Sequence, residues 1–124
     1  MSEIKQITEK IKKFRDERDW MQFHDPKNMA VSIILEASEL LEHFQWKTIE
    51  EVEEYARQNQ AEIQDEIADI ALYLFELADN LGINLKDAME QKLKKNEMKY
   101  PVEKAKGKYA KYNKKDQSKN FRPM

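Results

Sequence analysis

The 124-residue sequence has no cysteine, two glycines and three prolines. Without cysteine the chain can form neither a disulfide nor a thiolate metal site. Glycine and proline disfavour helix interiors, so their scarcity among many leucine, alanine, glutamate and lysine residues predicts an all-α protein. No hydrophobic run approaches the roughly 18 apolar residues of a membrane span, and the N-terminus lacks the apolar core of a signal peptide. We therefore expect a cytoplasmic protein without membrane contacts.

The formal net charge of −2 hides an uneven distribution of charge. Residues 1–98 contain 13 Lys/Arg and 22 Asp/Glu, whereas residues 99–124 contain 9 and 2. A basic end can bind nucleic acid or phosphates, but a solvated terminus is the more common outcome. Because no helix is rich in Arg or Asn, nucleic acid is not the expected partner. We expect residues 1–112 to form one domain and residues 113–124 to form a basic, flexible tail.

Four long segments carry apolar residues at three- and four-residue spacing, which predicts four helices. Their expected limits are Glu3–Arg18, Pro26–Trp46, Ala61–Leu81 and Leu85–Lys99. Asp25 before Pro26 is a helix-start pattern, and Thr48 with Glu51 forms a capping-box pattern for a short helix up to about residue 60. Gly82 is placed to end the third long helix in a left-handed conformation. The residues after Pro101 lack helical periodicity.

Short links between long helices make neighbours antiparallel and predict a four-helix-bundle-like fold with one short extra helix. The apolar stripes are numerous for a chain of this length. We therefore also expect dimerisation through the helices, with part of the core shared between two copies.

Two of the predicted helices carry paired carboxylates beside their apolar stripes. Glu36 and Glu39 lie one turn apart on the second helix, and Glu66 and Asp69 do so on the third. Residues 36–46 and 65–79 contain no Lys or Arg that could neutralise them. Carboxylates near a core lose hydration and repel each other, and a divalent cation relieves both costs. An all-oxygen ligand set suits Mg²⁺ or Mn²⁺ better than Zn²⁺.

Other readings of these acids stay open at this point. Acid pairs three residues apart occur on many solvated helices, and a non-catalytic helical interaction module would carry them too. A di-iron bundle requires Glu-x-x-His elements, and neither His24 nor His43 lies three residues after a glutamate. His43 lies on the Glu36 side of its helix, which allows a supporting role near a metal or a place at the edge of the core.

Several longer motifs accompany the Glu36-x-x-Glu39 and Glu66-x-x-Asp69 pairs. They are FRDERDWMQFHDPKN, ELLEHFQWK, IADIALYLFELAD and KLKKNEMKYPVEKAKGKY. Together they resemble the MazG-like all-α nucleotide pyrophosphohydrolases, and among these the dCTP pyrophosphatase branch, over about Phe14–Tyr112. The resemblance implies a homodimer or homotetramer that cleaves a nucleoside triphosphate between the α- and β-phosphates. The implied substrate is dCTP or a modified dCTP, with dUTP or phosphoribosyl-ATP as alternatives, and the implied role is removal of unwanted nucleotides.

The resemblance also assigns roles to residues. Glu36, Glu39, Glu66 and Asp69 are expected to bind Mg²⁺, with Mn²⁺ as a possible substitute, and Glu39 is our choice for the catalytic general base. Cationic, amide and phenol groups are expected to bind the triphosphate, and aromatic rings are expected to contact the base. These substrate-binding candidates are Lys27, Lys92, Asn96, Lys99 and Tyr100, and Trp20, His24, Trp46 and Tyr73. Arg15 is a further phosphate candidate. The ordinary alternatives are a solvated basic face and aromatic packing at the ends of a bundle.

Overall fold

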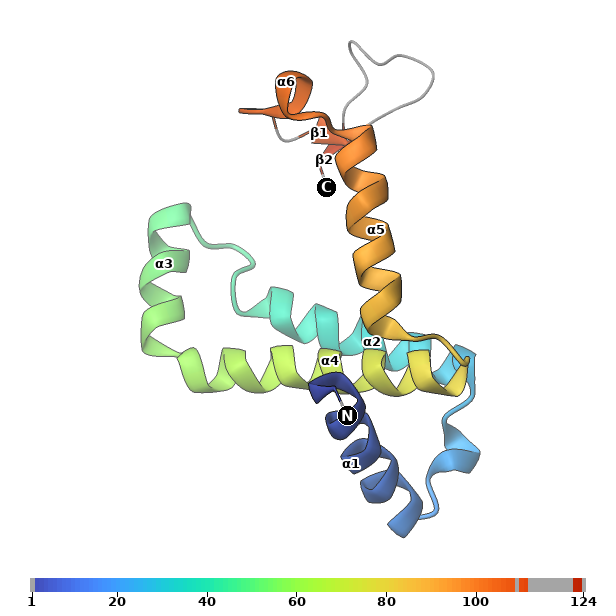
Figure 1. Cartoon of the computed structure of the whole chain (residues 1–124). Coiled ribbons are helices and arrows are strands. Elements are labelled where there is room, and N and C mark those ends of the chain that lie inside the picture. The colour runs from blue at the N-terminus through green and yellow to red at the C-terminus, as the bar shows by residue number, and fades with distance from the viewer. Residues whose placement is uncertain (1, 109, 112–121, 124) are drawn as a thin grey trace. The chain divides into compact units, whose positions relative to one another are not determined.

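The computed structural model describes residues 2–108, 110–111 and 122–123, which form two compact units. The first unit is Met1–Leu85 and the second is Lys86–Met124. The described elements are helices apart from one pair of two-residue strands, which confirms the predicted all-α class. Figure 1 shows the arrangement of these elements along the chain. The expected tail, residues 113–124, lies outside the described residues except for positions 122 and 123.

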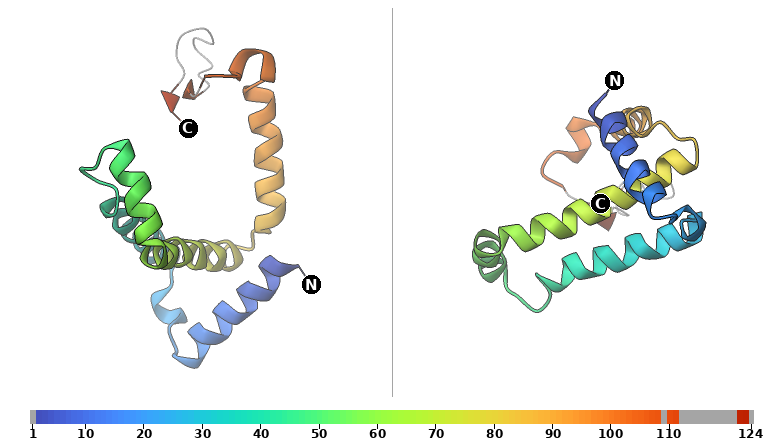
Figure 2. Two further views of the ribbon diagram at one scale, coloured as in Figure 1. Left: turned by 90° about the vertical axis from the view of Figure 1, so that its left-hand side faces the viewer. Right: turned by 90° about the horizontal axis from the view of Figure 1, so that it is seen from below.

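The first unit is built on an antiparallel helix pair. Its elements are α1 (Glu3–Glu17), a 3₁₀ turn (Met21–Phe23), α2 (Pro26–Glu42), α3 (Ile49–Gln58) and α4 (Gln60–Asn80). The helices α2 and α4 run side by side in opposite directions, and α1 packs against α4 (Figures 1 and 2). The short helix α3 follows α2 and leads directly into α4, as the capping pattern predicted.

The predicted helix signals act as expected on the backbone. The Asp25 side chain accepts a hydrogen bond of 3.0 Å from the backbone N–H of Asn28 at the start of α2. Thr48 and Glu51 exchange both bonds of a capping box, at 3.2 and 3.4 Å. Gly82 follows α4 with φ +70°, a left-handed conformation that glycine adopts without steric cost.

Two predictions of secondary structure were wrong by more than one residue. The helix α2 ends at Glu42 and not at Trp46, because residues 43–46 form turns in which the Phe44 N–H bonds the Leu41 carbonyl at 2.9 Å and Trp46 has φ +71°. Residues 102–105, expected to be irregular, form the single-turn helix α6 (Val102–Ala105). One helical turn is too short to show apolar periodicity, so this pattern could not reveal it.

The second unit contains α5 (Leu85–Lys99) apart from its first residue, followed by α6 and a minimal strand pair. The strands β1 (Ala110–Lys111) and β2 (Arg122–Pro123) are antiparallel, with position 110 opposite 123 and 111 opposite 122. The expected packing of α5 onto the other long helices stays a prediction. Among the described residues, no helix has both the length and the apolar character needed to cross a membrane.

The core within a single chain is small. Among the described residues, Met29 (1% exposed) and Ala78 (8% exposed) are the only buried apolar side chains. Large apolar side chains of α2 and α4 remain more than half exposed, including Ile34, Leu35, Leu41 and Ile67. An isolated chain thus leaves much of its apolar helix surface in water.

Candidate metal centre and adjoining cavity

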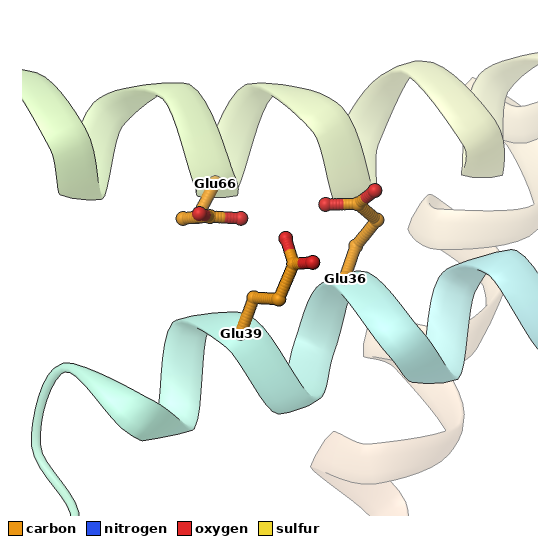
Figure 3. Close-up of side chains that lie close together, drawn as sticks. All are labelled: Glu36, Glu39 and Glu66. Atoms are coloured by element: carbon orange, nitrogen blue, oxygen red, sulfur yellow. The ribbon is translucent and has the colours of Figure 1, made fainter.

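Three carboxylates meet between α2 and α4. Glu36 and Glu39 lie one turn apart on α2 and point toward Glu66 on the facing side of α4 (Figure 3). One carboxylate oxygen of each residue lies within 4.8 Å of the corresponding oxygens of the other two. The antiparallel helix pair therefore converts two distant sequence motifs into one acidic cluster, as the sequence predicted for these three residues.

The electrostatics of this cluster are unfavourable for three ionised groups. Burial, followed by a hydrogen bond with Glu39 and the charges of Glu39, Asp69 and Glu66, raises the pKa of Glu36 from 4.5 to about 7. Burial also raises the pKa of Glu66, and Glu39 adds to this, while His43 acts in the opposite direction. His43 Nδ1 lies 2.7 Å from the Tyr55 hydroxyl, so this histidine bridges α3 and the edge of the cluster.

Two oxygens of the cluster are both buried and unpartnered. Glu36 Oε2 and Glu66 Oε2 have no hydrogen-bond partner among the described residues. Within that part of the chain, neither glutamate forms an ion pair with a Lys or Arg. Buried oxygens without donors are costly, and a divalent cation would satisfy them and cancel the repulsion. The donor set therefore fits a metal ion that prefers oxygen ligands.

Asp69, the fourth predicted ligand, lies beside this cluster and not within it. Its carboxylate is not part of the group of oxygens that lie within 4.8 Å of one another. Its charge nevertheless raises the pKa of both Glu36 and Glu66, and it lines a cavity together with Glu36. The structure thus brings three of the four predicted ligands together and places the fourth next to them.

A cavity of about 580 Å³ adjoins the cluster within the first unit. Its wall includes Trp20, His24 and Tyr73, three of the residues predicted to contact the substrate. Apolar side chains of α1 and α4 also line the wall, namely Ile7, Ile11, Phe14 and Leu72, together with the charged residues Lys10, Arg15, Glu36, Asp69 and Glu76. Aromatic and apolar walls next to a few polar groups are typical of sites that bind a planar ligand.

A buried polar network lies in the same wall and was missed by the sequence analysis. Glu76 is only 3% exposed, and its Oε2 lies 2.7 Å from His24 Nδ1, 3.1 Å from Asn80 Nδ2 and 3.5 Å from Arg15 Nη1. Arg15 also donates to Asn80 Oδ1 at 3.2 Å and to Asp16 Oδ1 at 2.8 Å. The sequence did contain a signal for this buried carboxylate. Glu76 is an acidic residue within the apolar run ALYLFELAD, seven residues after Asp69.

The remaining predicted substrate residues lie outside this cavity wall. Lys27 is exposed in the first turn of α2, and Trp46 is 92% exposed with its left-handed backbone after α2. The others belong to α5 and to the position after it, in the second unit: Lys92, Asn96, Lys99 and Tyr100. Their approach to phosphate groups stays a prediction.

Comparison with known proteins identifies the family. The model of the MazG-like family matches residues 31–114, and the chain belongs to this family. It is 39% identical to dCTP pyrophosphatase 1 of Bos taurus over 101 residues, and 37% identical to that of Homo sapiens over the same length. Each match covers 80% of this chain, and the chain spans about three fifths of these relatives, 60% and 59%.

A solved structure gives the same result for the fold. A pyrophosphatase from Archaeoglobus fulgidus superimposes with a TM-score of 0.78 at 41% sequence identity. The match covers 82% of this chain and 94% of that one. The predicted resemblance to MazG-like proteins and to the dCTP pyrophosphatase branch is therefore confirmed.

Proposed function

We propose that the chain is a nucleoside triphosphate pyrophosphohydrolase that converts dCTP, or a modified dCTP, to the monophosphate and pyrophosphate. The proposal rests on family membership, on the similarity to dCTP pyrophosphatase 1 and on the site itself. The observation that carries it is the pair of buried, unpartnered oxygens of Glu36 and Glu66 beside a cavity with aromatic walls. Hydrolysis of dUTP or phosphoribosyl-ATP is the alternative within the superfamily.

The proposed cofactor is Mg²⁺, with Mn²⁺ as a substitute. Glu36, Glu39 and Glu66 supply its protein ligands, and Asp69 is the proposed fourth. Hard oxygen donors favour these ions over softer metals. When bound, such an ion neutralises phosphate charge and lowers the pKa of a coordinated water.

Proton transfer and substrate binding are assigned to separate side chains of the chain. Glu39 is the proposed general base that accepts the proton of the attacking water, because its carboxylate lies between those of Glu36 and Glu66 (Figure 3). Trp20 and Tyr73 in the cavity wall hold the base and the sugar. Lys27, Lys92, Asn96, Lys99 and Tyr100 are the proposed triphosphate ligands, and Trp46 a further aromatic contact for the base.

We further propose that the chain functions as a homodimer or homotetramer. The α2–α4 pair leaves Ile34, Leu35 and Leu41 exposed to between 57% and 64%. Exposed apolar surface of this kind is unfavourable in water and favours association with a complementary surface. A second copy that covers these helices would complete the small core of the single chain.

Product analysis tests the proposed activity. We expect purified full-length chain with MgCl₂ to convert dCTP to dCMP and pyrophosphate, identified by ³¹P NMR. Glu66→Gln should lower the rate by about 100-fold or more, since it removes a charged ligand whose alignment the reaction needs. Glu42→Gln, the same change at an exposed position of α2, should keep the rate. Release of dCDP and phosphate, or no turnover of dCTP, dUTP and phosphoribosyl-ATP, would overturn the proposal.

A further inference from the structure

Glu76 is a buried carboxylate for which the proposed hydrolysis has no use. Its contacts with His24, Asn80 and Arg15 all converge on Oε2, and Oε1 takes no part in them. Each carboxylate oxygen has two lone pairs that accept hydrogen bonds. Because Glu76 lines the cavity, its Oε1 is able to accept hydrogen bonds from a ligand there. Three contacts with side chains from different parts of the chain hold this carboxylate in place.

The spacing along α4 places Glu76 at a suitable distance from the acidic cluster. Asp69, Tyr73 and Glu76 are separated by four and three residues, so they lie on the same side of the helix, and all three line the cavity. At a rise of 1.5 Å per residue, Glu76 lies about 10 Å along the helix axis from Asp69. This is about the length of a nucleoside. A nucleotide with its phosphates at the cluster can therefore reach Glu76 with its base.

The chemistry of a carboxylate distinguishes between bases. An ionised carboxylate only accepts hydrogen bonds. Cytosine presents a 4-amino N–H donor, whereas uracil and thymine present the O4 acceptor at the same position. With a 4-oxo base, O4 and the Glu76 carboxylate oxygen would face each other as two acceptors, and neither would have a hydrogen-bond donor. Unpaired polar groups of this kind allow a binding site to reject an analogue of its ligand.

We propose that Glu76 is a specificity-determining residue that accepts a hydrogen bond from the 4-amino group of a cytosine base and disfavours 4-oxo pyrimidines. His24, Arg15 and Asn80 act as positioning residues, because they hold the carboxylate through Oε2. The inference rests on the proposed function in one respect, namely that the ligand of the cavity is a nucleotide.

Equilibrium binding of monophosphates tests this role without any turnover. By isothermal titration calorimetry with MgCl₂ present, the full chain should bind dCMP at least about tenfold more tightly than dUMP. Glu76→Gln keeps the shape and can turn an amide N–H toward O4, so it should lose most of this preference. Glu9→Gln, at an exposed position of α1, should keep it. An unchanged ratio in Glu76→Gln, equal binding by the unmodified chain, or binding of neither nucleotide would overturn the inference.

A second experiment removes the 4-amino group from the ligand and leaves the protein unchanged. It therefore does not depend on whether the Glu76→Gln variant folds. The deoxyribonucleoside monophosphate of 2-pyrimidinone lacks the 4-amino group but is otherwise like dCMP. The unmodified chain should bind it at least about tenfold more weakly than dCMP. Equal affinity would contradict the proposal. A chain that prefers dCMP but hydrolyses no triphosphate would overturn the proposed activity alone, because binding of monophosphates requires no hydrolysis.

Discussion

Metal binding by the acidic cluster should release protons near neutral pH. The pKa of Glu36 is raised from 4.5 to about 7, and a cation needs the ionised carboxylate. From this pKa, Glu36 is protonated in about nine tenths of metal-free molecules at pH 6, half at pH 7 and one tenth at pH 8. Each bound ion should therefore displace about 0.9, 0.5 and 0.1 proton from Glu36 at these three pH values. The apparent affinity should rise by nearly tenfold per pH unit below 6 and level off above 8.

Calorimetry can count these protons. MgCl₂ is titrated into metal-free full-length chain at pH 6, 7 and 8, each in two buffers with different ionisation enthalpies. The difference in apparent binding enthalpy between buffers gives the number of protons released. Glu42→Gln should reproduce the unmodified chain, while Glu36→Gln should bind more weakly and lose most of the proton release.

The opposite result is equally clear. If no proton is released at pH 6 and the affinity is flat from pH 6 to pH 8, Glu36 is already ionised in the metal-free protein. Burial and carboxylate repulsion would then not raise its pKa, and the physical reason for a cation at this place would fail.

Stability and assembly depend on the same helices. Folding raises the pKa of Glu36, so the folded state binds the proton of this carboxyl more tightly than the unfolded state does. The melting temperature in EDTA should therefore fall as the pH rises from 4.5 to 7. Glu36→Gln should show a smaller fall, and an equal fall in this variant would contradict the raised pKa. Met29→Ala should lower the free energy of unfolding in urea by about 2–5 kcal/mol, and a loss below about 1 kcal/mol would show that Met29 is not a core residue. Leu41→Glu should yield monomers in light scattering, and an unchanged mass would exclude Leu41 from the interface.

The helices and the close approach of the three carboxylates Glu36, Glu39 and Glu66 could be predicted because both depend on local rules. Capping at Asp25 and Thr48 involves residues three apart, and a helical turn brings Glu36 and Glu39 to one face. The missing cations around Glu66 were visible in the sequence as well. An acidic cluster between two antiparallel helices followed from these features without knowledge of the packing.

The network around Glu76 could not be predicted in this way. Its partners Arg15 and His24 lie 61 and 52 residues earlier, on other elements, and periodicity places a residue on a face without naming its neighbours. Arg15 was considered for phosphate binding, and the structure pairs it with Asp16, Glu76 and Asn80. The end of α2 was not predicted because the spacing of apolar residues does not report backbone conformation, such as the left-handed conformation of Trp46.

The proposed chemistry depends on a divalent cation bound by the carboxylates of Glu36, Glu39 and Glu66. Cation binding at this place can be seen in an anomalous difference map from crystals of the full chain soaked in MnCl₂. We expect a manganese peak within coordination distance of these three carboxylates, with Glu36 Oε2 or Glu66 Oε2 among the ligands. Saturating manganese without a peak there, or an ion bound elsewhere while both oxygens stay unpartnered, would contradict it.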